Sequence, residues 1–273
     1  MHEATQLKSQ DDLATAAGKA AAAKVTSGMT SDEKDELLET TMMSMLDRQA
    51  QTPWFADIET FAAGGPPPAK SKFLMHSEPR LPQMPAKPTL MDYMKRRVLL
   101  NKRGGSHLLQ SAKLAMKNGL PEKLVLACLL HDLAVLCHVR TDHGYYAAQM
   151  LEPYVDEETA WAVRYHQALR FFPDPSVGYE YPELYTRVFG EEYQPPAYVR
   201  QAYDYARNHK WYMSARLVTL NDLYSFDPNA VVDVDDFADI MGRHFRQPEE
   251  GLGFDNSPAS HMWRSLIWPN NFL

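Results

Sequence analysis

Apolar residues recur at helical spacing over most of residues 89–246, and no segment alternates apolar and polar positions as a half-buried strand does. Residues 124–130 are apolar on every side, which is typical of a helix buried in a core. The pattern predicts an all-α protein with helices over 91–99, 107–117, 121–132, 143–154, 157–169, 215–224 and 234–245, and a further long helix that begins at 197.

Glycine and aspartate residues define several predicted helix ends. Gly104 and Gly105 should break the chain between two helices, because glycine weakens a helix interior. Gly119 should end the next helix, since glycine accepts the left-handed conformation that follows many helices. Asp142 and Asp156 each stand where a carboxylate would cap the start of a helix.

The chain divides into four predicted parts. Residues 1–30 are rich in Ala, Lys, Ser and Thr and can bury little surface, so we expect a mobile or loosely helical arm. Residues 31–88 should hold a packing helix and then an extended, Pro-rich segment that wraps over the domain. Residues 89–246 form that domain, with an irregular aromatic stretch at 171–196. Residues 247–273 form a tail whose aromatic side chains should pack on the domain.

Composition and charge exclude several classes of function. The 273 residues are 45% apolar, which suffices for one large domain or two small ones, and the formal charge of −7 without a basic stretch argues against nucleic-acid binding. No run of 18 apolar residues predicts a membrane span, and the N-terminus lacks a hydrophobic signal core. The two cysteines, Cys128 and Cys137, form no disulfide or zinc pattern, so we expect a reducing, cytoplasmic setting.

The candidate chemistry centres on His131 and Asp132, which end the most apolar helix. A core helix that ends on an imidazole and a carboxylate needs a partner for both, because burying unpaired polar groups costs several kcal/mol. A divalent metal ion satisfies both, and further candidate ligands lie on other predicted helices. Two ions that share Asp132 as a bridge would use the full set, which is His107, His131, Asp132, His143, His166 and Asp222. His138 is an alternative to His143.

The order of these ligands, His…His-Asp…His…His…Asp, resembles the HD-domain superfamily over about residues 90–245. Local sequences resemble the mixed-valence di-iron oxygenase branch, which includes the hydroxyphosphonate oxygenases and, more distantly, myo-inositol oxygenase. The similar stretches are residues 107–112, 131–134, 143–148, 166–171 and 221–228. The spacings of 24 residues from His107 to His131 and 56 from His166 to Asp222 are also similar to those of the phosphonate oxygenases.

The resemblance implies an HD-domain helical bundle, two Fe ions in the Fe(II)/Fe(III) state, and O2 as co-substrate. One iron would take His107, His131, Asp132 and Asp222, the other Asp132, His143 and His166, with His131 and Asp132 at the catalytic centre. The implied reaction hydroxylates or oxidatively cleaves a small, polar, hydroxylated and anionic substrate, which resembles an organophosphonate or a polyol. Arg170, one helical turn after His166, would hold the anionic end. Tyr145 and Tyr146 follow the candidate ligand His143, so we expect one of them, taken as Tyr145, to line the cavity. A surface salt bridge is the alternative for Arg170.

Other features leave alternatives open. The branch usually has a glycine and then a His or Lys after its His-Asp-Ile, where this chain has Ala134 and Val135, so one substrate contact is absent. A metal-dependent phosphohydrolase acting on a phosphate ester and a non-catalytic, regulatory HD domain are the rival functions, and a homodimer is possible. The remaining histidines should be surface or packing residues: 2, 76, 209, 244 and 261.

Overall fold

The structure is a computed structural model that describes residues 19, 22–30, 34, 37–38, 82–135 and 142–267. Several predictions fall wholly or mainly outside these residues: the arm 1–30, the helix after residue 31, most of the Pro-rich segment, His138, and the last aromatic residues of the tail.

The described residues form helices joined by short loops, which confirms the predicted all-α class. They contain no strand, only an isolated bridge between Asp174 and Tyr179. The α-helices are α4 Leu90–Arg96, α5 Lys102–Lys117, α6 Glu122–Leu130, α7 His143–Leu151, α8 Glu157–Leu169, α9 Glu183–Phe189, α10 Ala197–Arg207, α11 Tyr212–Leu223, α12 Ala238–His244 and α13 Ser260–Ile267. Three short 3-10 helices are η2 Val98–Leu100, η4 Pro175–Val177 and η5 Val234–Phe237.

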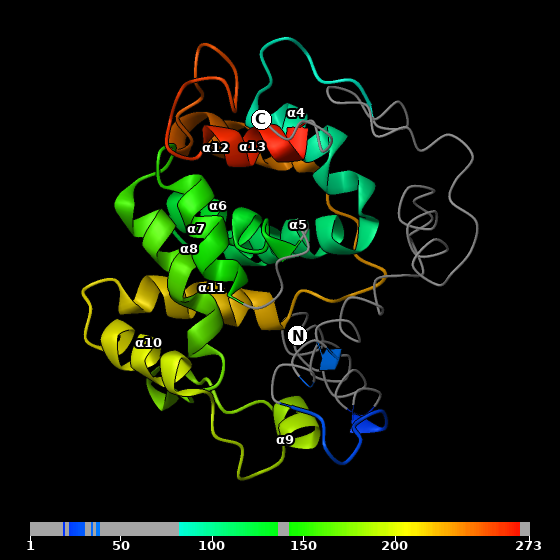
Figure 1. The fold of residues 1–273 in the computed structure, drawn as a ribbon, viewed down its shortest axis with the longest axis vertical. Coiled ribbons are helices and arrows are strands. Elements are labelled where there is room, and N and C mark those ends of the chain that lie inside the picture. Colours follow the sequence, from blue (N-terminus) through cyan, green and yellow to red (C-terminus); the bar gives the residue numbers. More distant parts are fainter. Residues whose placement is uncertain are drawn as a thin grey trace.

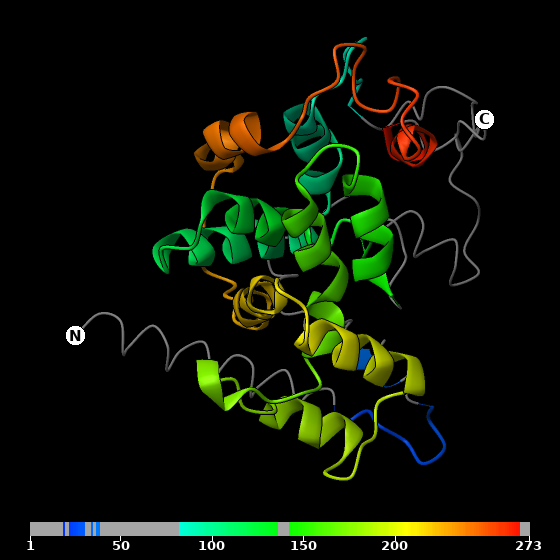
Figure 2. The same ribbon diagram turned by 90° about the vertical axis from the view of Figure 1, so that its left-hand side faces the viewer.

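Helices α5, α6, α7, α8 and α11 form the middle of the molecule (Figure 1). In that view α4, α12 and α13 lie at one end, while α9 and α10 lie at the other, and Figure 2 shows the same separation after a quarter turn. Helix α6 is the centre of the core, because each of its residues from 124 to 130 is buried. Its C-terminal end therefore delivers the next residues of the chain into the interior.

The predicted break at Gly104 and Gly105 is wrong, because both residues lie in the first turn of α5. The side chain of Asn101 caps this helix by accepting a hydrogen bond from the Gly104 backbone N–H at 3.2 Å. A Cβ atom on Gly105 would lie 3.0 Å from the Val98 carbonyl oxygen, so glycine here allows η2 to pack closely against α5. The glycines mark a close approach rather than a loop.

Other helix ends agree only in part with the sequence pattern. Gly119 has a φ of 69° after α5, as predicted, and the Asp156 side chain caps α8 through the Thr159 backbone N–H at 2.7 Å. Asp142 has a φ of 57° and makes no side-chain cap to α7, so it does not cap that helix. Helix α7 also ends at Leu151, earlier than predicted.

Two helices were not predicted at all. Helix α9 lies inside the stretch expected to be irregular, and its Tyr185 and Phe189 are buried in an aromatic cluster with Phe171. Helix α13 lies in the C-terminal tail, where Trp263 is fully buried and donates from its indole N–H to the Met150 carbonyl at 2.8 Å. No helix in the described part of the chain has the length and apolar character to cross a bilayer.

Candidate metal centre

The structure brings the six predicted metal ligands together from five places in the fold. His107 lies on α5, His131 and Asp132 follow α6, His143 is the first residue of α7, and the last two lie on α8 and α11. The four imidazoles and Asp132 are buried, and the Asp222 side chain is 19% exposed. They form two groups that share Asp132, one of His107, His131, Asp132 and Asp222, the other of Asp132, His143 and His166.

The potential ligand atoms converge within each group. His107 Nε2 lies 3.2 Å from His131 Nε2 and 3.1 Å from Asp222 Oδ1. In the second group, His143 Nε2 lies 3.2 Å from His166 Nε2 and 3.1 Å from Asp132 Oδ1. Two ligands bound about 2.1 Å from one ion lie about 3.0 to 3.4 Å apart in right-angled to tetrahedral geometry. The observed separations therefore match those of atoms that bind a common ion.

Backbone carbonyl groups fix the orientation of three of the imidazoles. Nδ1 of His107 donates to the Ser225 carbonyl at 3.1 Å, and Nδ1 of His131 donates to the Cys128 carbonyl at 2.8 Å. Nδ1 of His166 donates to a carbonyl one turn earlier on α8 at 2.6 Å. A carbonyl only accepts hydrogen bonds, so each Nδ1 carries its proton, and in the neutral ring Nε2 presents a lone pair to the cluster.

These contacts give a test of whether the residues fit a metal ion. Two imidazoles whose Nε2 atoms face each other at 3.2 Å repel as neutral rings unless a proton or a metal ion lies between them. Asp132 Oδ1 is buried and has no hydrogen-bond partner, although it is near imidazoles of both groups. A buried carboxylate oxygen without a partner is costly, and a bound cation removes that cost. The donor set of imidazoles and carboxylates suits Fe, Mn, Zn or Co.

Charges within the cluster shift the pKa values of its members. Burial raises the pKa of Asp132, but the charges of His131 and His143 outweigh burial and hold that pKa well below its usual range. Burial likewise raises the pKa of Asp222, but the nearby imidazoles of His107 and His131 lower it overall. Burial lowers the pKa of His131, yet Asp132 and Asp222 raise it to about 9. Without metal, the carboxylates are ionised and His131 carries a proton that a metal ion must displace.

A glycine sets the distance between the two helices that supply the second group. A Cβ on Gly144 would lie 2.8 Å from the Val163 carbonyl oxygen and 3.2 Å from His166 Cε1. Only glycine leaves space for α7 to approach α8 this closely. The residue that follows His143 in the sequence thus determines how near His143 comes to His166.

The segment after α11 supports the first group. Phe226 stacks on the His107 ring with centroids 4.4 Å apart, next to the Ser225 carbonyl that binds the same imidazole. The Gln110 side chain donates to the Asp227 carbonyl and accepts from the Asp227 backbone N–H, both at 2.9 Å. Gln110 thus connects α5 to the segment that orients His107. These supporting residues lie in the stretches that carry the resemblance, but sequence reasoning assigned a role only to the ligands.

The two predicted substrate residues differ in their placement. Arg170 is only 5% exposed, so the alternative of a surface salt bridge is wrong. Its guanidinium carbon lies 4.8 Å from the centroid of the Phe171 ring. Tyr145 is 48% exposed, with the Arg164 guanidinium 4.4 Å from its ring centroid. The structure therefore does not bring Tyr145 to the buried cluster, and it is not retained as a substrate contact.

The remaining histidines in the described residues lie outside the cluster. His209 stacks on Trp161 with ring centroids 4.4 Å apart, and His244 lies 3.0 Å from a carboxylate oxygen of Glu122. His261 is exposed on α13. All three have the packing or surface roles that were predicted.

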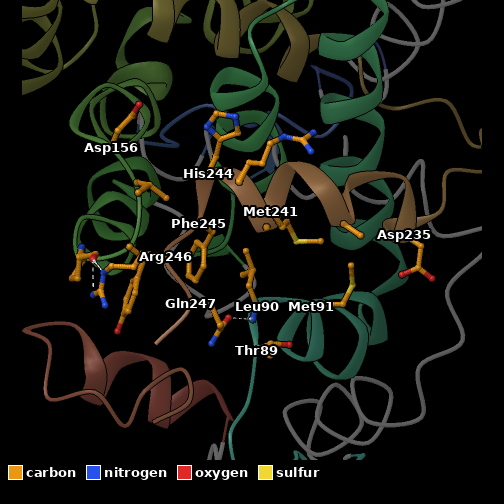
Figure 3. Close-up of a pocket in the computed structure, with 16 residues that line it drawn as sticks. Thr89, Leu90, Met91, Asp156, Asp235, Met241, His244, Phe245, Arg246 and Gln247 are labelled. Carbon is orange, nitrogen blue, oxygen red and sulfur yellow. Dashed lines mark hydrogen bonds between the residues drawn. The ribbon is translucent and has the colours of Figure 1, made fainter. Parts of the chain in front are cut away.

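A separate cavity of about 850 Å3 lies between α4, α12 and the turn after α7 (Figure 3). None of the six candidate ligands lines it. Its polar groups have partners within the protein: Gln247 accepts from the Leu90 backbone N–H at 2.9 Å, and Arg246 donates to the Pro153 carbonyl at 2.8 Å (Figure 3). The cavity is therefore separate from the candidate metal centre.

The six residues form a buried cluster of the kind that binds metal ions in proteins. Comparison with models of known protein families and with curated proteins found no match. The function of this cluster is therefore inferred from its own residues and distances.

Proposed function

We propose that the protein is a non-haem di-iron oxygenase that uses O2 to hydroxylate or oxidatively cleave a small, anionic, hydroxylated substrate. The observation that carries the proposal is the unequal division of ligands. One group has four protein ligands and the other has three, and the two share Asp132. Three protein ligands leave coordination positions for substrate and O2, as a catalytic metal site requires.

Two iron ions would provide redox-active positions at which O2 is bound and accepts the electrons lost by the oxidised substrate carbon. Asp132 would hold the two ions together, since its carboxylate lies 3.1 Å from His143 of one group and 3.5 Å from His131 of the other. The carbonyl groups bound to Nδ1 of His107, His131 and His166 keep the Nε2 atoms of these three rings directed inward. Burial of the ligands excludes bulk water from the reacting groups.

Arg170 supplies the proposed specificity for an anion. It follows His166 by one helical turn, so both side chains leave α8 on the same face. A buried guanidinium is a strong partner for a phosphonate or carboxylate, because it donates two parallel hydrogen bonds and stays charged. The similarity of the ligand order to the di-iron branch of the HD-domain superfamily supports the same assignment.

The first test is metal analysis with Mössbauer and EPR spectroscopy on anaerobically purified, partly reduced protein. About two irons per chain with a coupled Fe(II)/Fe(III) signal, perturbed by hydroxyphosphonates or polyols, is the expected result. Zinc or manganese without such a signal, together with hydrolysis of phosphate esters, would replace the oxygenase by a metal-dependent phosphohydrolase. A fully metallated protein with neither activity would favour a regulatory domain.

Ligand variants make the assignment specific. His166→Ala should lose one iron and keep the other, because the four-ligand group contains no residue of α8. Asp132→Ala should lose both, since Asp132 belongs to each group. His244→Ala is the matched control, because His244 lies on α12 beside Glu122 and should leave the iron content unchanged.

A further inference from the structure

Arg216 is the most deeply buried charged side chain outside the metal groups in the described part of the chain, with an exposed fraction of 0%. It lies on α11 and reaches across to the C-terminal end of α8. Its Nη1 donates to the Leu169 carbonyl and its Nη2 to the Phe172 carbonyl, each at 2.9 Å. These two carbonyls lie on either side of Arg170 in the chain, so Arg216 spans the turn that carries the proposed anion-binding residue.

The Arg170 carbonyl itself is held by a neighbour of Arg216. The Tyr179 hydroxyl donates to it at 2.6 Å, and the Arg216 guanidinium carbon lies 4.7 Å from the centroid of the Tyr179 ring. Arg216 also donates to the Tyr212 hydroxyl at 3.0 Å and lies 3.9 Å from Asp174. The backbone of the turn at Arg170 is therefore fixed by buried side chains at three carbonyl groups, those of residues 169, 170 and 172.

The cost of such an arrangement argues for a specific role. A fully buried charge is expensive, and replacing buried ion pairs with apolar residues of similar size is often neutral or stabilising. General stability therefore does not require an arginine at position 216. A planar guanidinium has the geometry to bind two carbonyls at once, which a lysine ammonium at the same place does not have.

Helix α11 links this turn to both metal groups. Arg216, Thr219 and Asp222 are spaced three residues apart and so lie along one side of the helix. Thr219 donates its hydroxyl to the His166 carbonyl at 2.7 Å, and Asp222 belongs to the four-ligand group. One side of α11 thus supplies a ligand, holds the backbone at a second ligand, and holds the turn at Arg170.

We propose that Arg216 is a positioning residue that fixes the position of Arg170 relative to the two metal groups. An anionic substrate can then contact Arg170 and the metal centre at the same time. This inference rests on the proposed function, because it takes Arg170 as the anion contact. Arg216 does not touch the substrate, and its effect on anion binding passes through Arg170.

The experiment is a double-mutant cycle with inorganic phosphate as the anionic probe. Phosphate affinity is measured by calorimetry on anaerobic protein loaded with two Fe(II) ions, for wild type, Arg170→Gln, Arg216→Met and the double variant. We expect Arg170→Gln and Arg216→Met each to weaken phosphate binding about tenfold, equivalent to one charge-assisted hydrogen bond. The double variant should be no weaker than Arg170→Gln alone, because Arg216 acts through that residue.

Two further variants separate positioning from a general loss of stability. Arg216→Lys keeps the charge but not the double carbonyl contact, so we expect an intermediate loss of affinity with normal iron content. If Arg216→Met does not fold, Arg216→Lys takes its place in the double-mutant cycle. Arg97→Met is the matched control: Arg97 donates to the Leu266 and Ile267 carbonyls at the end of α13, so its loss should lower stability without changing phosphate affinity.

The outcomes distinguish this inference from the function on which it rests. If Arg170→Gln weakens phosphate binding while Arg216→Met and Arg216→Lys leave it unchanged, Arg216 is a structural residue only and the inference is overturned. If the losses of phosphate-binding free energy in Arg170→Gln and Arg216→Met add up in the double variant, Arg216 does not act through Arg170 and the inference is overturned. If Arg170→Gln has no effect, the anion assignment of the proposed function fails, and the inference fails with it.

Discussion

The substitution Gly144→Ala should selectively weaken binding of the second metal ion, which the three-ligand group of Asp132, His143 and His166 holds. The new Cβ would lie 2.8 Å from the Val163 carbonyl oxygen and 3.1 Å from the Arg164 carbonyl oxygen, whereas ordinary contact begins at 3.4 Å. Relief of the closer contact requires α7 and α8 to separate by about 0.6 Å, which is the difference between 3.4 and 2.8 Å. Both obstacles are backbone atoms of a helix, so rotation of a side chain cannot relieve them.

This displacement acts directly on His143, which precedes Gly144, and on His166, which faces it from α8. Metal sites tolerate ligand displacements of only about 0.2 Å. We therefore expect the second metal ion to bind about 10- to 100-fold more weakly, the range found when the surroundings of ligands are altered. The four-ligand group contains no residue of α7 and should bind its ion as in the wild type. Overpacking should also lower the free energy of unfolding by about 1–3 kcal/mol.

Stepwise titration with Fe(II) under anaerobic conditions, followed by calorimetry, measures the two affinities separately. Gly242→Ala is the matched control, because Gly242 is an exposed helical glycine of α12 with nothing within 4 Å of its added Cβ. That control should stabilise the protein by about 0.4–1 kcal/mol and leave both affinities unchanged. Two wild-type affinities in Gly144→Ala, despite lower stability, would refute the link between helix separation and metal binding.

Three further results are expected. Gln110→Leu removes both hydrogen bonds to Asp227 and so loosens the segment that orients His107. In the same Fe(II) titration, this variant should weaken metal binding by the four-ligand group more than by the three-ligand group, which is the reverse of the effect of Gly144→Ala. Without metal, burial lowers the pKa of His131, but Asp132 and Asp222 raise it from 6.5 to about 9. Protonated His131 should therefore stabilise the folded protein fully below pH 6.5, and this contribution is lost as the pH rises through about 9. Thermal unfolding in chelator should show the loss, and a melting temperature that stays constant from pH 6 to 10 would contradict it. Trp263 is fully buried, so Trp263→Ala should lower the free energy of unfolding by about 3–5 kcal/mol in denaturant titrations. A loss below about 1 kcal/mol would mean that the C-terminal tail does not unfold cooperatively with the core.

The candidate ligands were predictable from the sequence because each has a strong local signal. His131 and Asp132 follow a helix whose residues 124–130 are all buried, and a polar pair at that place must face the interior. His166 and Asp222 lie on helices whose positions follow from the spacing of apolar residues. The all-α fold was predictable for the same reason. The sequence could not show that four imidazoles converge to 3.2 Å in facing pairs, because that depends on how five segments pack.

Helix boundaries failed where a tertiary contact overrides local preference. Gly105 weakens an isolated helix, but in the fold it permits η2 to approach α5, where a Cβ would lie 3.0 Å from the Val98 carbonyl oxygen. Helix α13 is short and its stability depends on the burial of Trp263 against the core, which no window of the tail sequence reveals. In both cases the deciding contact joins residues that a local pattern does not relate.

The supporting residues of the centre divide into two kinds by what they leave in the sequence. Ser225 and Cys128 hold imidazoles through backbone carbonyls, which every residue possesses, so no side-chain pattern could have identified them. Arg216 and Thr219 act through side chains and do leave a trace, because they lie three residues apart on the side of α11 that also carries Asp222. Polar residues repeated at that spacing on a buried helix cannot all face solvent. When one of them is a metal ligand, the others are therefore expected to support the site, and this rule would have identified both residues from the sequence.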